Sequence, residues 1–173
     1  MDVMSLIKTR RSIRSFSTEP VPDDILEQLV EAGCWAPSGS NAQACEFIVV
    51  RDGEKIKRLQ RFAPGLFVAP PVAIVVCVDR ERALARGGPQ GRDVMCLFDA
   101  AMAAQNIMLL AHSLGLGTCV LRGFDQSAFR VLLNLPPDVT PELLITLGFP
   151  KQVPKAPERR PLHEVLHYEG WNR

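Results

Sequence analysis

The chain of 173 residues has almost no excess of charge of either sign. It contains 20 Lys and Arg against 19 Asp and Glu, which gives a formal net charge of +1. Because there is no global positive field, nucleic acid is not an expected partner. The sequence also has no internal repeat and no low-complexity segment. With 47% hydrophobic and 23% charged residues, it is neither disordered, collagen-like nor a coiled coil. Its length predicts a single domain over residues 1–173.

The chain also lacks a Cys-x-x-Cys pair. Its cysteines are odd in number and stand among apolar neighbours, as in Val76-Cys77-Val78, so they are expected to be reduced and buried rather than bridged or zinc-bound. They occupy positions 34, 45, 77, 96 and 119. The first residues show no basic region followed by an apolar core, so we expect no signal peptide and a cytoplasmic protein.

No apolar run suggests a membrane span. The most apolar stretch, residues 94–116, is interrupted by Asp99, Gln105, Asn106 and His112, and a spanning helix needs about 20 predominantly apolar residues. The pattern instead favours a helix over residues 93–114, buried on nearly all sides and ending at Gly115 as a left-handed cap.

Two chemically suggestive patterns lack the context that they need. Gly115 and Gly117 do not begin a dinucleotide fingerprint, because Val120 stands where the third glycine should be and the order is helix, then strand. Residues 163–167 read H-E-x-x-H, but a catalytic zinc needs a third protein ligand, and Glu169 lies too close to serve. We therefore expect neither a Rossmann site nor a metal.

The remaining patterns predict an α+β domain with one central sheet. Helical spacing or caps indicate helices over residues 3–9, 22–32, 54–61, 93–114 and 127–133. Strands are expected at residues 47–50, 72–78, 119–121 and 143–147, the second of them buried on both faces. Residues 80–92 contain three glycines and a proline and are expected to form a mobile loop. Residues 149–173 contain four prolines and are expected to form an extended tail.

Two segments could hold a ligand. Arg10-Arg11-Ser12-Ile13-Arg14 offers three guanidiniums and a hydroxyl, which suit a phosphate, although a solvated basic turn has the same composition. Arg159 and Arg160 in the tail would complete such a site or lie exposed.

The second segment is residues 37–43, Pro-Ser-Gly-Ser-Asn-x-Gln. Its glycine lets the backbone approach a flat ligand, while Asn41 and Gln43 offer both donors and acceptors. An ordinary helix-to-strand turn is the alternative. Further along the chain, Gly123 leaves its backbone free to face a ligand.

In their order and spacing, these segments resemble the FMN-dependent nitroreductases. Residues 10–16 (RRSIRSF) match the family's R-R-S-x-R-x-F motif, and residues 36–43 (APSGSNAQ) match its A-P-S-x-x-N-x-Q loop. Residues 115–118 (GLGT), followed by Gly123, match its later glycine segment. Leu147-Gly148-Phe149-Pro150 and the Pro/Arg tail match its C-terminus, so the resemblance runs nearly end to end.

The resemblance implies a mixed or antiparallel sheet of about four to five strands flanked by helices, in an intertwined homodimer. Residues 149–173 would wrap the partner subunit, and FMN would lie at the interface. Arg10, Ser12 and a tail arginine would hold its phosphate, Arg14 would reach the pyrimidine end, and the loop at residues 37–41 would come from the partner. The implied cofactor-binding residues are Arg10, Arg11, Ser12, Arg14, Pro37, Ser38, Gly39, Asn41, Gln43, Leu121, Arg122, Gly123, Arg159 and Arg160.

The implied reaction is ping-pong hydride transfer from NAD(P)H through flavin N5 to a nitroaromatic, quinone or flavin acceptor, with no catalytic side chain. Ferredoxin remains open as a donor. A flavin store or sensor without turnover, or the same fold with dehalogenase or flavin-breakdown chemistry, are the alternatives. Two features depart from the family: the insertion that covers the flavin is absent or reduced to residues 87–91, and residues 63–67 lack the usual polar residue near the ring.

Overall fold

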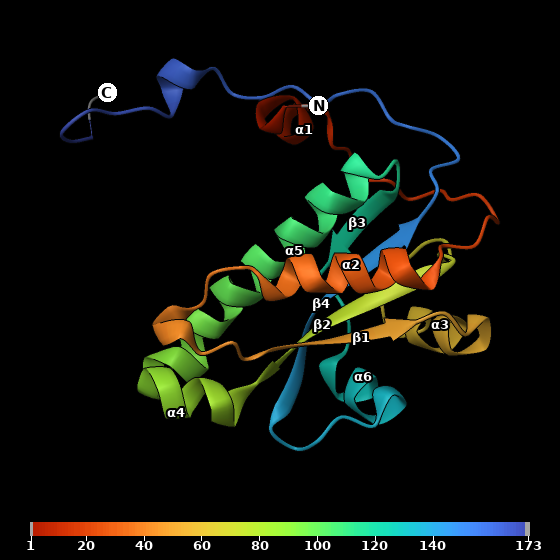
Figure 1. Ribbon diagram of the computed structural model, residues 1–173, viewed down its shortest axis with the longest axis horizontal. Coiled ribbons are helices and arrows are strands. Elements are labelled where there is room, and N and C mark those ends of the chain that lie inside the picture. Colours follow the sequence, from red (N-terminus) through yellow and green to blue (C-terminus); the bar gives the residue numbers. More distant parts are fainter. Residues whose placement is uncertain (1, 172–173) are drawn as a thin grey trace.

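The computed structural model describes residues 2–171, which form helices around one sheet (Figure 1). In chain order the elements are α1 (Val3–Thr9), α2 (Asp23–Cys34), the 3₁₀ turn η1 (Gly39–Asn41), β1 (Cys45–Val50), α3 (Gly53–Gln60), β2 (Val72–Asp79), α4 (Arg80–Gln90), the π-helical turn η2 (Gly91–Met95), α5 (Cys96–Ser113), β3 (Gly117–Leu121), α6 (Gln126–Leu133), β4 (Val139–Gly148) and the 3₁₀ turn η3 (Leu162–Glu164). The α+β class is therefore confirmed.

The sheet has the strand order β1-β2-β4-β3, and all three pairings are antiparallel. The sequence left mixed and antiparallel sheets open, and the antiparallel one is correct. A parallel pairing does occur outside the strands, as an isolated bridge between Ser12 and Thr118. The β2 residues from Val72 to Val78 are all buried, as the run of β-branched residues predicted.

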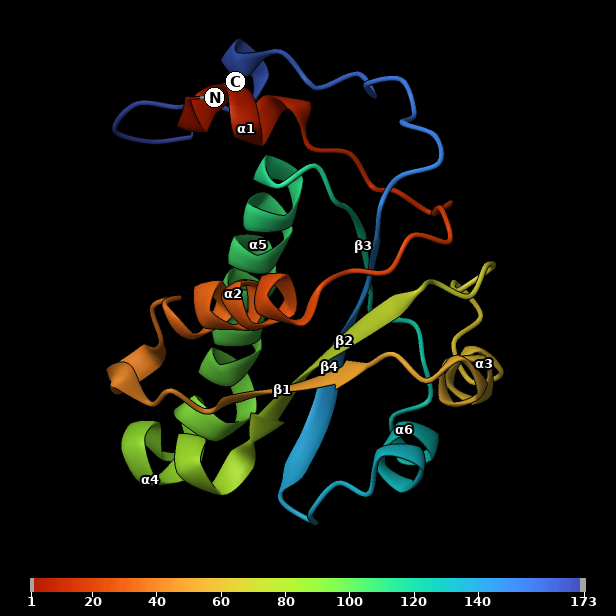
Figure 2. The ribbon, with the colours of Figure 1, turned by 45° about the vertical axis from the view of Figure 1, so that its right-hand side comes forward.

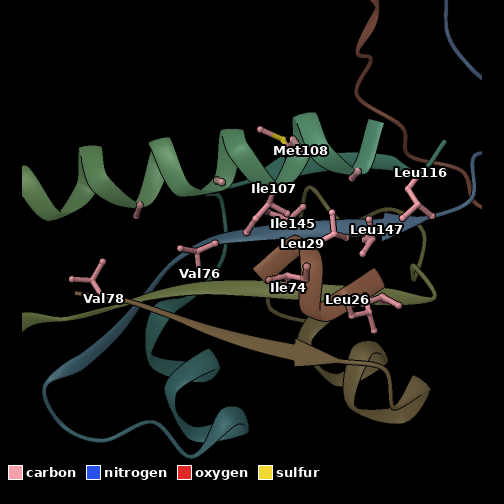
Figure 3. Packing of buried hydrophobic residues seen from close by; sticks show 14 of the residues in the cluster. Leu26, Leu29, Ile74, Val76, Val78, Ile107, Met108, Leu116, Ile145 and Leu147 are labelled. Carbon is pink, nitrogen blue, oxygen red and sulfur yellow. The ribbon is translucent and has the colours of Figure 1, made fainter. Parts of the chain in front are cut away.

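Two apolar layers cover the two faces of the sheet (Figures 2 and 3). Side chains alternate along β2, so Ile74 and Val76 pack with residues of α2 and α5, whereas Ala73 and Val75 pack with residues of α3 and α6. Each fully buried Val or Ile contributes about 1.5–3 kcal/mol relative to an exposed one. The continuous apolar run of β2 is explained by this double burial.

The long helix α5 differs from the prediction because it is not buried on nearly all sides. One side packs on α2 and the sheet, but Leu97, Phe98 and Met102 are exposed, as is Val94 just before the helix. By length and composition alone, the helical stretch Arg80–Ser113 could cross a membrane, and 44% of its apolar 18-residue segment is buried inside the fold. The exposed residues form an apolar face over which no other part of residues 2–171 packs.

The prediction of a mobile loop at residues 80–92 is wrong, since this segment is largely helical. The Asp79 side chain caps α4 by accepting a hydrogen bond from the Arg82 backbone N–H at 2.9 Å. Residues 80–86 are mostly strong helix formers, and the glycines interrupt the helix only at Gly88, whose φ of +63° breaks the helical geometry. The prediction gave the glycines too much weight as helix breakers and the helix-forming residues 80–86 too little.

The N-terminal segment after α1 lies along the outer edge of β3. The Ile13 N–H donates to the Thr118 carbonyl at 2.8 Å, and Gly117 leaves the space that Ile13 fills: a Cβ at residue 117 would stand 2.7 Å from the Ile13 side chain. Further on, Phe16 forms an isolated bridge with Pro150. The basic segment is thus fixed between the sheet and the beginning of the tail.

The tail is extended and exposed, as predicted, and lies with α1 at one end of α5 (Figures 1 and 2). In the H-E-x-x-H stretch, residues 162–164 form a single 3₁₀ turn, so its two histidines do not share an α-helical face. The His167 ring instead stacks on Trp171, with ring centroids 4.3 Å apart.

Candidate functional site

The basic segment presents its cations to two different hollows. Ile13 is buried against Gly117, Arg10 lines a small pocket of about 150 Å³ together with His112, and Arg14 lines a larger one. The Arg11 guanidinium donates to the carbonyls of Lys8 and Arg10, both at 2.8 Å. Among residues 2–171, no hydrogen bond or ion pair involves the guanidiniums of Arg10 and Arg14. Two cations are therefore available to a ligand.

Partial burial and the positive charge of the basic segment both lower the pKa of His112 at the end of α5. His112 lies beside the segment, with its Nε2 atom 2.9 Å from the Thr9 hydroxyl. Partial burial lowers the pKa of His112, and the positive charges of Arg10 and Arg11 lower it further. The same field that disfavours a second cation favours an anion.

A cleft of about 810 Å³ opens next to Arg14. Leu121, Arg122 and Gly123 line it where β3 ends, and Phe124 and Asp125 continue its wall into α6. A side chain of the basic segment and the later glycine segment therefore face one cavity, although more than 100 positions separate them in the sequence.

A buried carboxylate forms an ion pair with the Arg122 side chain beside this cleft. Glu142 is 2% exposed and is skipped in the register between β2 and β4, where Val76 pairs with Leu143 but Cys77 with Pro141. Such a bulge re-aims a side chain. The carboxylate forms ion pairs with Arg80 and, at 3.3 Å, with Arg122. The Arg122 guanidinium is thus engaged, while the backbone at residues 122–123 is left at the cleft.

The loop at residues 37–43 has an unusual backbone. Ser40, Asn41 and Gln43 have φ values of +53°, +50° and +48°, a region that non-glycine residues seldom adopt and that costs about 1–3 kcal/mol each. The Ser38 hydroxyl accepts from the Gln43 N–H, and the Asn41 amide oxygen accepts from the Gln43 side chain, both at 3.0 Å. Strain maintained by a specific network is typical of functional loops.

Asp99 anchors this loop to α5. Its carboxylate is 3% exposed, and its two oxygens accept from the Gly39 N–H at 3.1 and 3.2 Å. Burial raises the pKa of Asp99, and the hydrogen bond from Gly39 partly opposes that rise.

Replacing Asp99 by asparagine is expected to remove a pH dependence of stability. The raised pKa means that the folded state binds the carboxyl proton more tightly than the unfolded state, so stability falls as pH rises above 3.8 through the folded pKa. Asparagine keeps an acceptor for Gly39 without the buried charge. We expect Asp99→Asn to match the wild type near pH 4 and to exceed it by up to about 1 kcal/mol at neutral pH. Urea unfolding at both pH values measures this, and a deficit of the variant at neutral pH would contradict it.

The arginines of the tail are both exposed. Arg160 forms an ion pair with Glu164 at 3.2 Å, and no ion pair or hydrogen bond involves the Arg159 guanidinium among residues 2–171. The tail starts beside the basic segment, where the Lys151 N–H donates to the Ser15 carbonyl at 3.0 Å. Either arginine remains a candidate to bind an anion at the basic segment.

The predicted site residues form two groups at opposite ends of α5 (Figures 1 and 2). The loop contacts Asp99 near the start of the helix, and Thr9, directly before the basic segment, contacts His112 near its end. Thirteen residues of α-helix separate these contacts by about 20 Å. One copy of the chain brings Arg14 together with residues 121–123, but it does not bring the loop to them.

Sequence reasoning missed Glu142, Asp99 and Arg61. A carboxylate in the middle of an apolar helix was a signal for Asp99, because such a group is buried only with a partner. Glu142 gave no signal, since its burial depends on a bulge. Arg61 ends an ordinary polar helix, and only the fold places it at the cleft.

Comparisons with known proteins agree on one family. The model of the nitroreductase family matches residues 7–67 and 63–149. A Methanothermobacter thermautotrophicus protein whose name joins NADH dehydrogenase and NAD(P)H nitroreductase is 35% identical, over 99% of this chain and 88% of its own length. The NADPH-flavin oxidoreductase of Vibrio harveyi is 32% identical, over 96% and 73%. The structure of an FMN-dependent nitroreductase of Clostridium difficile superimposes with a TM-score of 0.84 at 27% identity, over 98% of this chain and 100% of that one.

Proposed function

Because the chain belongs to the nitroreductase family, we propose that it is an NAD(P)H-dependent oxidoreductase that binds FMN in a site built from two copies. The observation that carries this proposal is the unpartnered guanidinium of Arg14 at the 810 Å³ cleft, with the unpartnered guanidinium of Arg10 four residues earlier in the same segment. A segment fixed to a sheet edge and carrying two free cations suits a ligand that joins a phosphate to a flat ring.

Arg10 and Ser12 bind the phosphate in this proposal, together with Arg159 or Arg160. Phosphate carries between one and two negative charges at neutral pH and accepts charge-assisted hydrogen bonds. Ser12 lies two residues from Arg10, where the segment pairs with Thr118, and the tail begins beside the same segment. Arg11 was also predicted to bind the cofactor, and its contacts with two carbonyls give it the role of shaping the segment.

Arg14 and the backbone at Arg122–Gly123 contact the ring. Both line the cleft, and the Arg122 guanidinium is already paired with Glu142, so the backbone at residues 122–123 is the part assigned to the ring. When bound, FMN supplies the hydride acceptance and donation. A cation at Arg14 stabilises negative charge on the reduced ring, so this side chain favours reduction without transferring a proton.

The second copy supplies Pro37, Ser38, Gly39 and Asn41, with Gln43 supporting their loop. One copy alone leaves this loop about 20 Å from the basic segment, and the apolar face of Leu97, Phe98 and Met102, at the loop end of α5, is exposed. Packing two such faces across a two-fold axis buries them and brings each loop toward the other copy's cleft. The extended tail at residues 149–173 then has a second copy to wrap.

Turnover proceeds in two steps in the same cleft. NAD(P)H binds, transfers hydride and leaves, and a nitroaromatic, quinone or flavin acceptor then takes its place. The absence of a dinucleotide fingerprint fits a nicotinamide that binds only transiently. The chain's own residues hold and polarise the ring, and they exclude water with Phe62, Phe67 and Phe124 along the wall.

An anaerobic titration tests this function. Purified protein reconstituted with FMN is expected to lose its flavin absorbance on addition of NADH or NADPH and to regain it with 4-nitrobenzamide. Protein that binds the flavin but is not reduced by either donor would contradict the oxidoreductase assignment and favour a flavin store.

A further inference from the structure

One cation of the cleft has no role in holding the flavin. Arg61 ends α3 and lines the same cleft as Arg14 and Gly123, on the wall formed by residues 61–67. Its side chain is exposed, and no hydrogen bond or ion pair involves its guanidinium within residues 2–171. Arg61 and Arg14 are therefore both unpartnered guanidiniums at this cleft, and they come from distant parts of the sequence.

The other charged groups of the cleft form no ion pair with Arg61 among residues 2–171. Arg122 is paired with Glu142 at 3.3 Å. Asp125, a carboxylate that also lines the cleft, serves as the N-cap of α6 and accepts from the Ala128 N–H at 2.9 Å. With Arg14 assigned to the flavin, the Arg61 guanidinium is left without a direct partner.

The wall that carries Arg61 is held firmly. The Asp125 N–H donates to the Phe62 carbonyl at 2.9 Å, which ties the end of α3 to the start of α6. The Gln60 side chain donates to the Leu66 carbonyl at 2.9 Å and closes the turn. The backbone that carries Arg61 is therefore well fixed at the cleft, and its side chain extends from it.

Aromatic rings lie next to this cation. Phe62 is 43% exposed and Phe67 78% exposed, and both line the cleft. Exposed aromatic surface in a cavity favours a flat apolar molecule that covers it. Rings with a guanidinium beside them match a molecule that is aromatic at one end and anionic at the other.

We propose that Arg61 is a specificity-determining residue and that it binds an anionic group, a carboxylate, sulfonate or phosphate, of the flat aromatic molecule that exchanges electrons with the flavin. The inference rests on the proposed function. The anion belongs either to the acceptor, as an aromatic carboxylate, or to the donor, as a phosphate of the nicotinamide dinucleotide. Arg61 contacts a part of the substrate that does not react, so its loss weakens binding of ground state and transition state alike.

The test compares Arg61→Gln with Arg58→Gln, a control on the last turn of the same helix whose exposed side chain does not line the cleft. For the acceptor 4-nitrobenzoate, Arg61→Gln is expected to lower kcat/KM about three- to tenfold, through KM, because an exposed charge-assisted contact is worth little more. With the neutral 4-nitrobenzamide, both variants should match the wild type. The difference should shrink as salt is added.

A donor arm distinguishes the two sources of the anion. The rate of anaerobic flavin reduction is measured against NADH and NADPH concentration, and a loss in that step for Arg61→Gln assigns the anion to the donor. Equal behaviour of Arg61→Gln and Arg58→Gln with 4-nitrobenzoate and both donors would overturn the inference.

A binding arm separates this inference from the proposed function. Calorimetry of benzoate and benzamide binding to the flavin-loaded protein needs no turnover. Arg61→Gln should weaken the binding of benzoate alone. If the wild type fails to accept electrons from either donor, the proposed function fails. If benzoate binds equally to the wild type and to Arg61→Gln, the role of Arg61 is overturned.

Discussion

Replacing Glu142 by alanine is expected to lower the free energy of unfolding by about 2–4 kcal/mol, the largest effect of any substitution near the site. The carboxylate lies on the β4 bulge and is 2% exposed. It accepts from the Thr140 hydroxyl at 2.9 Å and from the Gln126 side chain at 3.3 Å, in addition to its ion pairs with Arg80 and Arg122. Removing it leaves the Arg80 guanidinium, 23% exposed, without its countercharge.

The effect of this substitution should reach the cleft. Arg80 also donates to the Arg92 carbonyl, so Glu142 links the region before α5 to the loop after β3. Without it, Arg122 loses its partner and residues 122–125 gain freedom. Hydrogen exchange is expected to speed up in that loop, while urea unfolding reports the loss of stability.

Glu46→Ala provides the matched control for Glu142→Ala. Glu46 is an exposed glutamate on β1, and its replacement is expected to change stability by less than about 0.5 kcal/mol. Glu142→Gln should fall between the two, because it keeps the volume but loses the charge. Equal stabilities of Glu142→Ala and Glu46→Ala would show that the network does not stabilise the fold.

Replacing Arg10 by alanine is expected to weaken FMN binding by about 1–3 kcal/mol, which corresponds to a rise in Kd of about 5- to 150-fold. Arg10 contributes a charge-assisted contact to the phosphate in the proposed site, and no other group of residues 2–171 pairs with it. The stability of the apoprotein should change little, because no ion pair of the fold is lost.

Lys8→Ala is the control for Arg10→Ala. Lys8 is an exposed cation in the last turn of α1, two residues away, so it tests the effect of removing a positive charge without removing the contact. Flavin fluorescence titrations at low and high salt measure both Kd values. A Kd for Arg10→Ala equal to that of Lys8→Ala would remove the basic segment from the phosphate site.

The parts of the fold that the sequence predicted well are those decided locally. The run of β-branched residues in β2 specified a strand buried on both faces, and the acidic first turn of α2 marked a helix start. The Arg10 to Arg14 segment was singled out as a possible anion site because no other segment is as dense in guanidiniums, and that assignment stays a prediction. These features need no knowledge of what lies far along the chain.

The features that were missed depend on distant contacts. Hydrophobicity showed that α5 must be buried, but it does not tell whether its own chain covers it, and Phe98 is in fact 57% exposed. Ser40 and Asn41 adopt positive φ without being glycine, because Asp99, 60 positions away, holds the loop. Likewise, a bulge decides the burial of Glu142, and bulges leave no reliable pattern in sequence.

The central claim is that each flavin site joins the basic segment of one copy to the loop of another, and co-expression of two defective variants tests it most directly. One variant carries Arg10→Ala, and the other carries Ser38→Ala/Asn41→Ala. In a heterodimer of the two, one site receives both defects, and the second site receives the intact basic segment of one copy and the intact loop of the other. Random pairing of equal amounts should therefore restore about a quarter of all sites to wild-type flavin affinity. If the co-expressed mixture retains no more tightly bound FMN than the two variants alone, the two groups of residues do not meet across a dimer and the account is wrong.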